Sequence, residues 1–94
     1  MGYNYEDGTG KHVGHGPSIG GATKMLDVLE RYAGKNIYPN LHAFVETGES
    51  DSPKLIKAEA ERLMAKVTDK HVYDTLSRLA RAASQAKDKL VVTH

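Results

Sequence analysis

Glycine is distributed very unevenly along this chain of 94 residues. Seven of the nine glycines lie within the first 21 residues, and every long apolar periodicity begins after them. A glycine inside a helix costs about 1 kcal/mol relative to alanine, so the glycine-rich segment is a poor helix former. The sequence therefore predicts two parts, a glycine-rich N-terminal arm over residues 1–17 and a helical domain over residues 18–94.

The arm has the pattern of a short hairpin. Tyr3 and Tyr5 alternate with polar residues, and Asp7-Gly8 is a common turn signal whose second residue takes a positive φ. Residues 11–13 then have the character of a return strand. The apolar alternation is very short, however, and an irregular arm fits the same residues equally well.

Three longer stretches have the apolar spacing of amphipathic helices. The first is expected over residues 18–33, and the second begins at Ser52-Pro53, an N-cap residue followed by proline at the first helical position. The third is expected over residues 70–90, after Asp69 interrupts the second helix and caps the next. The three apolar stripes consist of Ala22, Met25, Leu26, Leu29 and Ala33; of Ile56, Ala60, Leu63 and Val67; and of Val72, Leu76, Leu79, Ala83, Ala86 and Leu90.

Residues 37–46 are ambiguous. Asn40 can cap a short helix whose apolar face holds Leu41 and Phe44, and the same residues fit a buried strand. We favour the short helix, and residues 91–92 read as an apolar tail. The predicted fold class is all-α, a small bundle of three main helices with a fourth short one and a glycine-rich arm that can form a hairpin.

Length and composition bound the kind of protein. A chain of 94 residues makes one domain with a modest core, so a homo-oligomer that adds buried surface is expected. There is no cysteine, which excludes disulfides, thiolate zinc sites and a thiol nucleophile and fits a reducing cytoplasm. No apolar run approaches the ~20 residues that cross a membrane, and the N-terminus lacks the basic and apolar regions of a secretory signal. We expect a cytoplasmic protein without a membrane partner.

Charge is nearly balanced but unevenly placed. The formal net charge is +1; residues 1–50 hold four Lys or Arg against six Asp or Glu, whereas residues 51–94 hold nine against six. This difference in charge between the two halves is too small to predict strong binding to a nucleic-acid backbone. The wet face of the second helix is expected to carry two ion pairs, Lys57–Glu61 and Glu59–Arg62.

The arm is the strongest candidate for a site. Its glycines permit close backbone approach, and it leads into the N-terminus of the first predicted helix, which is receptive to phosphate or carboxylate. Neither the P-loop motif nor the dinucleotide-binding motif is present, and a loop that uses glycine only to turn beneath a helix is the plainer alternative. The candidate ligand-binding residues are Tyr3, Tyr5, Lys11, His12, His15, Gly16, Ser18 and Lys24.

Aromatic and histidine residues sharpen this expectation. Tyrosines at positions 3 and 5 are assigned to binding, whereas Tyr32 and Tyr73 are assigned to the core or to a helix seam. His12 and His15 are spaced as H-x-x-H, but the four-ligand spacing of zinc sites is absent, so no metal and no cofactor are expected. Nothing in the sequence poises a nucleophile with a base, so no catalytic residue is assigned.

The sequence thus predicts a small non-enzymatic binding protein. The leading version is a homo-oligomer that holds an anionic, phosphate- or nucleotide-like ligand or an acidic surface at the arm and the N-terminus of the first helix. One alternative is a protein–protein inhibitor or adaptor that acts through helix faces and the N-terminal tyrosines. The other is a small metal-dependent enzyme.

Overall fold

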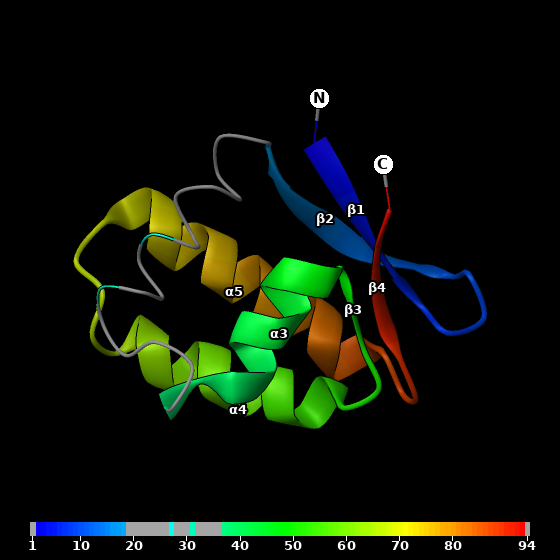
Figure 1. Ribbon diagram of the computed structural model, residues 1–94. Coiled ribbons are helices and arrows are strands. Elements are labelled where there is room, and N and C mark those ends of the chain that lie inside the picture. The colour runs from blue at the N-terminus through cyan, green and yellow to red at the C-terminus, as the bar shows by residue number, and fades with distance from the viewer. Residues whose placement is uncertain (1, 19–26, 28–30, 32–36, 94) are drawn as a thin grey trace.

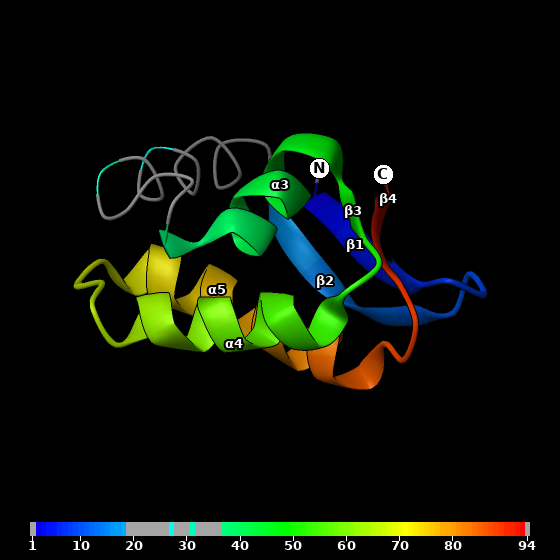
Figure 2. The ribbon, with the colours of Figure 1, turned by 60° about the horizontal axis from the view of Figure 1, so that its bottom comes forward.

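The computed structural model describes residues 2–18, 27, 31 and 37–93. The elements within these residues are, in chain order, β1 (Gly2–Asp7), β2 (His12–Ser18), α3 (Pro39–Thr47), β3 (Glu49–Ser50), α4 (Pro53–Met64), α5 (Lys70–Gln85) and β4 (Leu90–Thr93). The strands form one antiparallel sheet in the order β2-β1-β4-β3, with the helices on one face (Figure 1). Helix α5 packs on β2, α4 packs along α5, and α3 contacts α4 and β3 (Figure 2).

The prediction of an all-α helical bundle is therefore wrong, because the described residues have a mixed α+β fold. Strand β4 comes from the opposite end of the chain and inserts between β1 and β3. It has four residues and β3 has two, so neither is long enough to show the alternation that identifies a strand. Pairing with β1 makes a strand of the apolar tail at residues 91–92, and local sequence does not report such pairing.

The hairpin alternative for the arm is correct. Strands β1 and β2 are joined by a short turn in which the Asp7 carboxylate accepts hydrogen bonds from the backbone N–H groups of Thr9 and Lys11, at 2.9 and 3.0 Å. The residue with positive φ is Gly10, at 89°, and not the expected Gly8. The Asp7 N–H donates to the Lys11 carbonyl at 2.9 Å, so residues 8–10 form a three-residue loop that ends in a left-handed glycine, a common way to close a hairpin.

Two bulges explain why the strand pattern of the arm is weak. Glu6 pairs with His12 and the preceding residue, Tyr5, pairs with Gly14, so Val13 is an extra residue on β2 and is buried in the core. A second irregularity follows before β2 ends. Each bulge shifts the alternation of apolar and polar residues by one position, which hides the strand from a sequence reading.

The two long helices begin where the sequence predicts. Ser52 is the N-cap of α4 and Pro53 its first residue, and Asp69 caps α5 by accepting two backbone hydrogen bonds at 2.8 and 3.2 Å. Helix α5 ends at Gln85, so the predicted extension to residue 90 is wrong. Leu90 is nevertheless fully buried, because it opens β4 and packs into the same core.

Helix α3 confirms the helical alternative for residues 37–46. It begins at Pro39, so Asn40 is its second residue and the prediction of Asn40 as the cap is wrong. Glu59, a residue of α4, caps α3 instead. Its carboxylate accepts hydrogen bonds from the backbone N–H groups of Asn40 and Leu41 at 3.0 and 3.1 Å. Glu59 is only 5% exposed, so its expected place on the wet face of α4 is also wrong.

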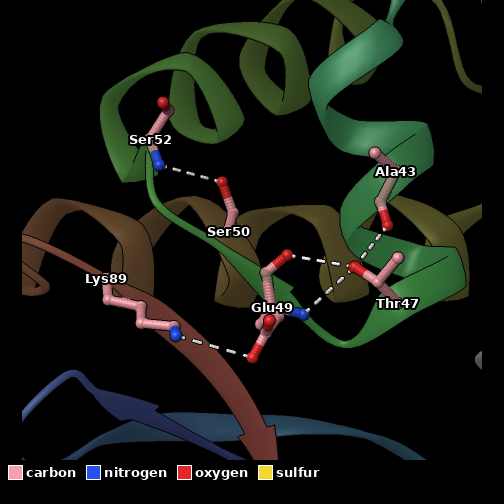
Figure 3. Close-up of polar contacts among 6 residues, drawn as sticks. All are labelled: Ala43, Thr47, Glu49, Ser50, Ser52 and Lys89. Atoms are coloured by element: carbon pink, nitrogen blue, oxygen red, sulfur yellow. Dashed lines mark hydrogen bonds and ion pairs between the residues drawn. The ribbon is translucent and has the colours of Figure 1, made fainter.

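The link between α3 and α4 fixes β3 beside β4. Gly48 ends α3 with a left-handed φ of 81°, and its carbonyl accepts a hydrogen bond of 2.7 Å from β4. The Thr47 hydroxyl donates to the Ala43 carbonyl at 2.8 Å, and Glu49 forms an ion pair of 3.6 Å with Lys89 (Figure 3). These contacts hold a two-residue strand that has little pairing of its own.

One core unites the sheet and the helices. Its buried apolar residues are Tyr5, Val13, Tyr38, Leu41, Phe44, Ile56, Ala60, Leu63, Val72, Leu76, Leu79, Ala80, Ala82, Ala83, Ala86 and Leu90. The first predicted helix and its apolar stripe lie outside the described residues, apart from Ser18 at the end of β2 and the exposed residues 27 and 31. Within the described ranges, no helix has both the length and the hydropathy to cross a membrane.

Candidate binding surfaces

The inner face of the sheet, toward the helices, is closely packed. Tyr5 is 3% exposed, and its ring centroid lies 6.1 Å from that of Phe44. Burial raises the pKa of the Tyr5 hydroxyl far above its ordinary value. A Cβ atom on Gly14 would lie 3.2 Å from Cβ of Ala82, and one on Gly16 would lie 3.2 Å from Cζ of Tyr5. These two glycines therefore let β2 approach α5 and the tyrosine ring closely.

The outer face of the sheet carries polar side chains from all four strands. Residues paired across neighbouring strands point to the same side, which gives this face Asn4, Glu6, His12, His15, Glu49, Val91 and Thr93. His15 Nδ1 lies 3.2 Å from Asn4 Oδ1, and the His12 and His15 rings meet edge to face with centroids 4.8 Å apart. Thr93 donates to Glu6 at 3.0 Å. Asn4 with His15 and Glu6 with Thr93 thus form two polar pairs, and the face is typical of a solvated antiparallel sheet.

The structure divides the predicted site residues between these two faces. Tyr5 and Gly16 belong to the packed inner face, whereas His12 and His15 meet on the outer face. Lys11 is exposed where the turn ends. The remaining predicted residues are Tyr3, which is partly buried, Ser18, whose side chain is not described, and Lys24, which lies outside the described residues.

Two tyrosines differ in burial from what their predicted roles imply. Tyr5, predicted to bind a ligand, lies in the core, and Tyr73, predicted for the core or a helix seam, is 49% exposed on α5. Sequence spacing placed Tyr73 beside an apolar stripe that is already complete without it. Among the described residues, no group of three or more His, Asp or Glu side chains is arranged to hold a metal ion.

A groove between α4 and α5 forms a second surface, which the sequence did not single out. Its volume is about 560 Å³, and its lining residues are Lys54, Lys57, Ala58 and Glu61 from α4, Ala83 and Ser84 from α5, and Ala86 and Lys87 after α5. Six of these eight residues are exposed. The groove thus lies open on the surface, with buried alanines from the α5 side at its floor.

Lysine dominates the charge of this groove. The Lys57 ammonium lies 3.8 Å from the Glu61 carboxylate, so this predicted pair is confirmed and that lysine is partly neutralised. Lys54 and Lys87 have no ion-pair partner within the part of the chain that the structure describes. The excess of positive charge in residues 51–94 was the available sequence signal, but Lys87 joins the other two lysines only through the packing of α5 on α4.

No family model, curated protein or solved structure matches this chain. Function is therefore inferred from the chemistry of the two surfaces. On the outer face of the sheet, Asn4, Glu6, His15 and Thr93 already hydrogen-bond in pairs, whereas the groove offers two ammonium groups that have no ion-pair partner among the described residues and lie beside apolar surface. Of the two surfaces, the groove therefore has more charged groups that are available to a ligand.

Proposed function

We propose that this protein is a non-enzymatic binding protein that holds an anionic ligand in the groove between α4 and α5. The observation that carries the proposal is the placement of Lys54 and Lys87, two cations without an ion-pair partner among the described residues, along one groove. An ammonium group attracts carboxylate or phosphate, and an apolar surface beside it adds contact area for the rest of the ligand.

The groove supports this function better than the N-terminal arm does. The glycines at positions 14 and 16 face Ala82 and Tyr5 at close range, so on that side their backbone has no room for a ligand. His12 and His15 lie on the opposite face of the sheet from Tyr5, which separates the predicted binding residues. The anionic class of ligand is retained from the sequence, and its proposed position is new.

The contacts of the groove favour binding over chemistry. Ser84 is the hydroxyl-bearing residue of the lining, and it donates its hydrogen bond to the Arg81 carbonyl at 2.7 Å. A serine nucleophile instead needs a base that accepts that proton. Glu61, the carboxylate of the lining, is engaged with Lys57.

Self-association remains a proposal of its own. Met25, Val28 and Tyr32 of the first predicted helix form an apolar shoulder that favours self-association, but these residues lie outside the described ones. Within the described residues, three large apolar side chains are exposed: Ile37, Leu55 and Tyr73. Light scattering at tens of micromolar, roughly the range where weak dimers form, is expected to give a mass above that of one chain. A mass of 10.3 kDa would contradict it.

Calorimetric titration with three anionic probes tests the function. The probes are inorganic pyrophosphate, a short glutamate-alanine peptide and a short oligothymidylate, and the variant is Lys54→Glu with Lys87→Glu. We expect at least one probe to bind the parent and to lose affinity in this variant. The matched control is Lys66→Glu with Lys70→Glu, which changes the net charge equally at the other end of the same helix pair. Equal binding by the two variants, or binding of none of the probes, would contradict the proposal.

A further inference from the structure

We infer that the ligand of the α4–α5 groove is an acidic segment of a partner protein, in which carboxylate side chains alternate with small apolar ones. This inference rests on the proposed function and names the chemistry of its ligand. It is carried by the arrangement of lysines around an alanine floor, which fits a chain with two kinds of side chain.

The size and openness of the groove favour a peptide segment over a small anion. A water molecule has a share of about 30 Å³ in the liquid, so a volume of about 560 Å³ far exceeds what one phosphate group fills. Sites for small ligands enclose most of the ligand surface. Here six of the eight lining residues are exposed, so a small anion would keep most of its contact with water.

The charges lie on both sides of the groove. Lys54 and Lys57 belong to α4, three residues apart, whereas Lys87 follows α5 on the other wall. Residues three apart on a helix share a side of it, so the two α4 lysines form one wall. Successive carboxylates along a peptide can pair with lysines on both walls of such a groove.

The alanines that line the groove provide apolar surface for the apolar side chains of the ligand. Ala83 and Ala86 are buried, Ala58 is exposed, and all three line the groove. Small side chains there leave space for apolar groups of a ligand, and removing such groups from water favours binding. A ligand with charge alone would leave this surface in contact with water.

Nucleic acid fits the same groove less well. Single strands bind by stacking bases on aromatic side chains, and no aromatic residue is among those that line the groove. Duplex binding draws on many phosphate contacts. The groove has three lysines, of which one is paired with Glu61, and the whole chain has a formal net charge of only +1.

Fluorescence anisotropy with a labelled peptide of alternating glutamate and alanine tests this inference. We expect binding that weakens between low and physiological ionic strength, because the pairs are exposed. Lys54→Glu with Lys87→Glu is expected to lower the affinity about tenfold or more, and Lys66→Glu with Lys70→Glu is expected to leave it nearly unchanged. Thermal melts of both variants establish that they fold.

A second variant tests the alanine floor. Ala58→Leu fills part of the groove at an exposed helical position, so the fold is expected to tolerate it. It should lower the affinity for the glutamate-alanine peptide several-fold. Peptide affinity unchanged by Ala58→Leu would contradict the role of the floor in the inference.

The outcomes separate the inference from the function on which it rests. If pyrophosphate or oligothymidylate binds through Lys54 and Lys87 and the peptide does not, the inference is overturned and the proposed function stands. If the peptide binds the doubly substituted Lys54 and Lys87 variant as well as it binds the parent, the groove is not its site and the inference is overturned. If none of the probes binds the parent protein, both proposals are overturned.

Discussion

The two faces of the N-terminal hairpin have opposite chemistry, although they are made by alternate residues of the same two strands. On the inner face, Tyr5 lies against Phe44, and Gly14 lies close to Ala82. On the outer face, His12 and His15 contact each other in a polar layer that no described helix covers. The inner face resembles a protein interior and the outer face a protein surface.

This difference changes the meaning of the glycine-rich segment. Glycines near a predicted helix suggested a plastic loop that wraps a ligand, but two of them serve to bring a strand close to α5 and to an aromatic ring. Gly14 and Gly16 flank His15, whose side chain lies on the outer face, so the two-residue period of a strand places both glycines on the inner face. The role of a glycine in such a segment is therefore inferred more reliably from the strand face on which it lies than from the overall polarity of the segment.

Removal of the hairpin gives the largest expected effect. Deleting residues 2–13 takes away β1, which lies between β2 and β4, and removes Tyr5 and Val13 from the core. The folded state of a domain this size is stabilised by only about 5–15 kcal/mol, so we expect no cooperative thermal transition in circular dichroism. If the deletion variant melted like the parent, the inner face would not be part of the core.

Truncation of the central aromatic residue is expected to come next. Tyr5→Ala should lower the free energy of unfolding by about 3–5 kcal/mol, because it leaves a cavity beside Phe44. His12→Ala, its control on the outer face, should change that free energy by no more than about 0.5 kcal/mol. Denaturant titrations of both variants measure the contrast directly. Similar losses in the two would show that the faces do not differ as described.

Local signals in the sequence were sufficient for the starts of α4 and α5, whereas they left a hairpin and an irregular arm as equal alternatives for the N-terminal residues. Asp69 starts α5 by accepting hydrogen bonds from the backbone just after it, and Pro53 starts α4 after Ser52, whose side chain makes no capping hydrogen bond. Both starts can be read without knowing the fold. Local signals also favoured a helix over a strand for the segment that forms α3 from Pro39, but they did not identify the residue that caps it. That cap comes from Glu59 on another helix, and such a contact has no local signature.

The sheet and the groove both depend on contacts between distant residues. Residues 91–92 form a strand only because β1 pairs with them, and this pairing joins the two ends of the chain. Likewise, Lys54 and Lys57 could be placed together on one helix face, but Lys87 reaches their groove through the packing of α4 on α5. Positions that require tertiary structure are therefore the ones that the sequence left open.

The close approach of β2 to α5 at Gly14 can be tested by a double-mutant cycle, in which we expect changes in the free energy of unfolding of intermediate size. Gly14→Ala places a Cβ atom 3.2 Å from Cβ of Ala82, and overpacking of this kind costs about 1–3 kcal/mol. Ala82→Gly, which removes the opposing atom, should recover part of that cost when combined with Gly14→Ala, beyond the sum of the two single changes. Unfolding free energies of the two single variants, the double variant and the parent complete the cycle.

Gly10→Ala serves as a comparison outside the inner face. Nothing lies near a Cβ atom at that position, but its φ of 89° is strained for alanine. It should destabilise the protein through backbone conformation alone, so Ala82→Gly should give no recovery there. Recovery of Gly10→Ala by Ala82→Gly would contradict the specific contact between β2 and α5.

The smallest expected effect lies at the hairpin turn, which is exposed to solvent like the outer face. The Thr9 hydroxyl, at 2.6 Å, and the Lys11 backbone N–H hold the pKa of Asp7 below its ordinary value of 3.8. A carboxylate with a lowered pKa in the folded state stabilises the fold above its ordinary pKa and loses this effect as the pH falls through the folded pKa. Stability should therefore decline in acid partly through Asp7.

Asp7→Asn removes that titration while it keeps an oxygen that accepts the turn hydrogen bonds. Melting temperatures measured from about pH 6 to pH 2 should fall less steeply for this variant than for the parent. Thr9→Ala, which deletes the nearest donor, should flatten the same slope in part, because the folded-state pKa of Asp7 then moves back toward its ordinary value. If Asp7→Asn and the parent lose stability in acid at the same rate, the turn contributes nothing to the acid response. The buried inner face and the rest of the chain would then account for all of it.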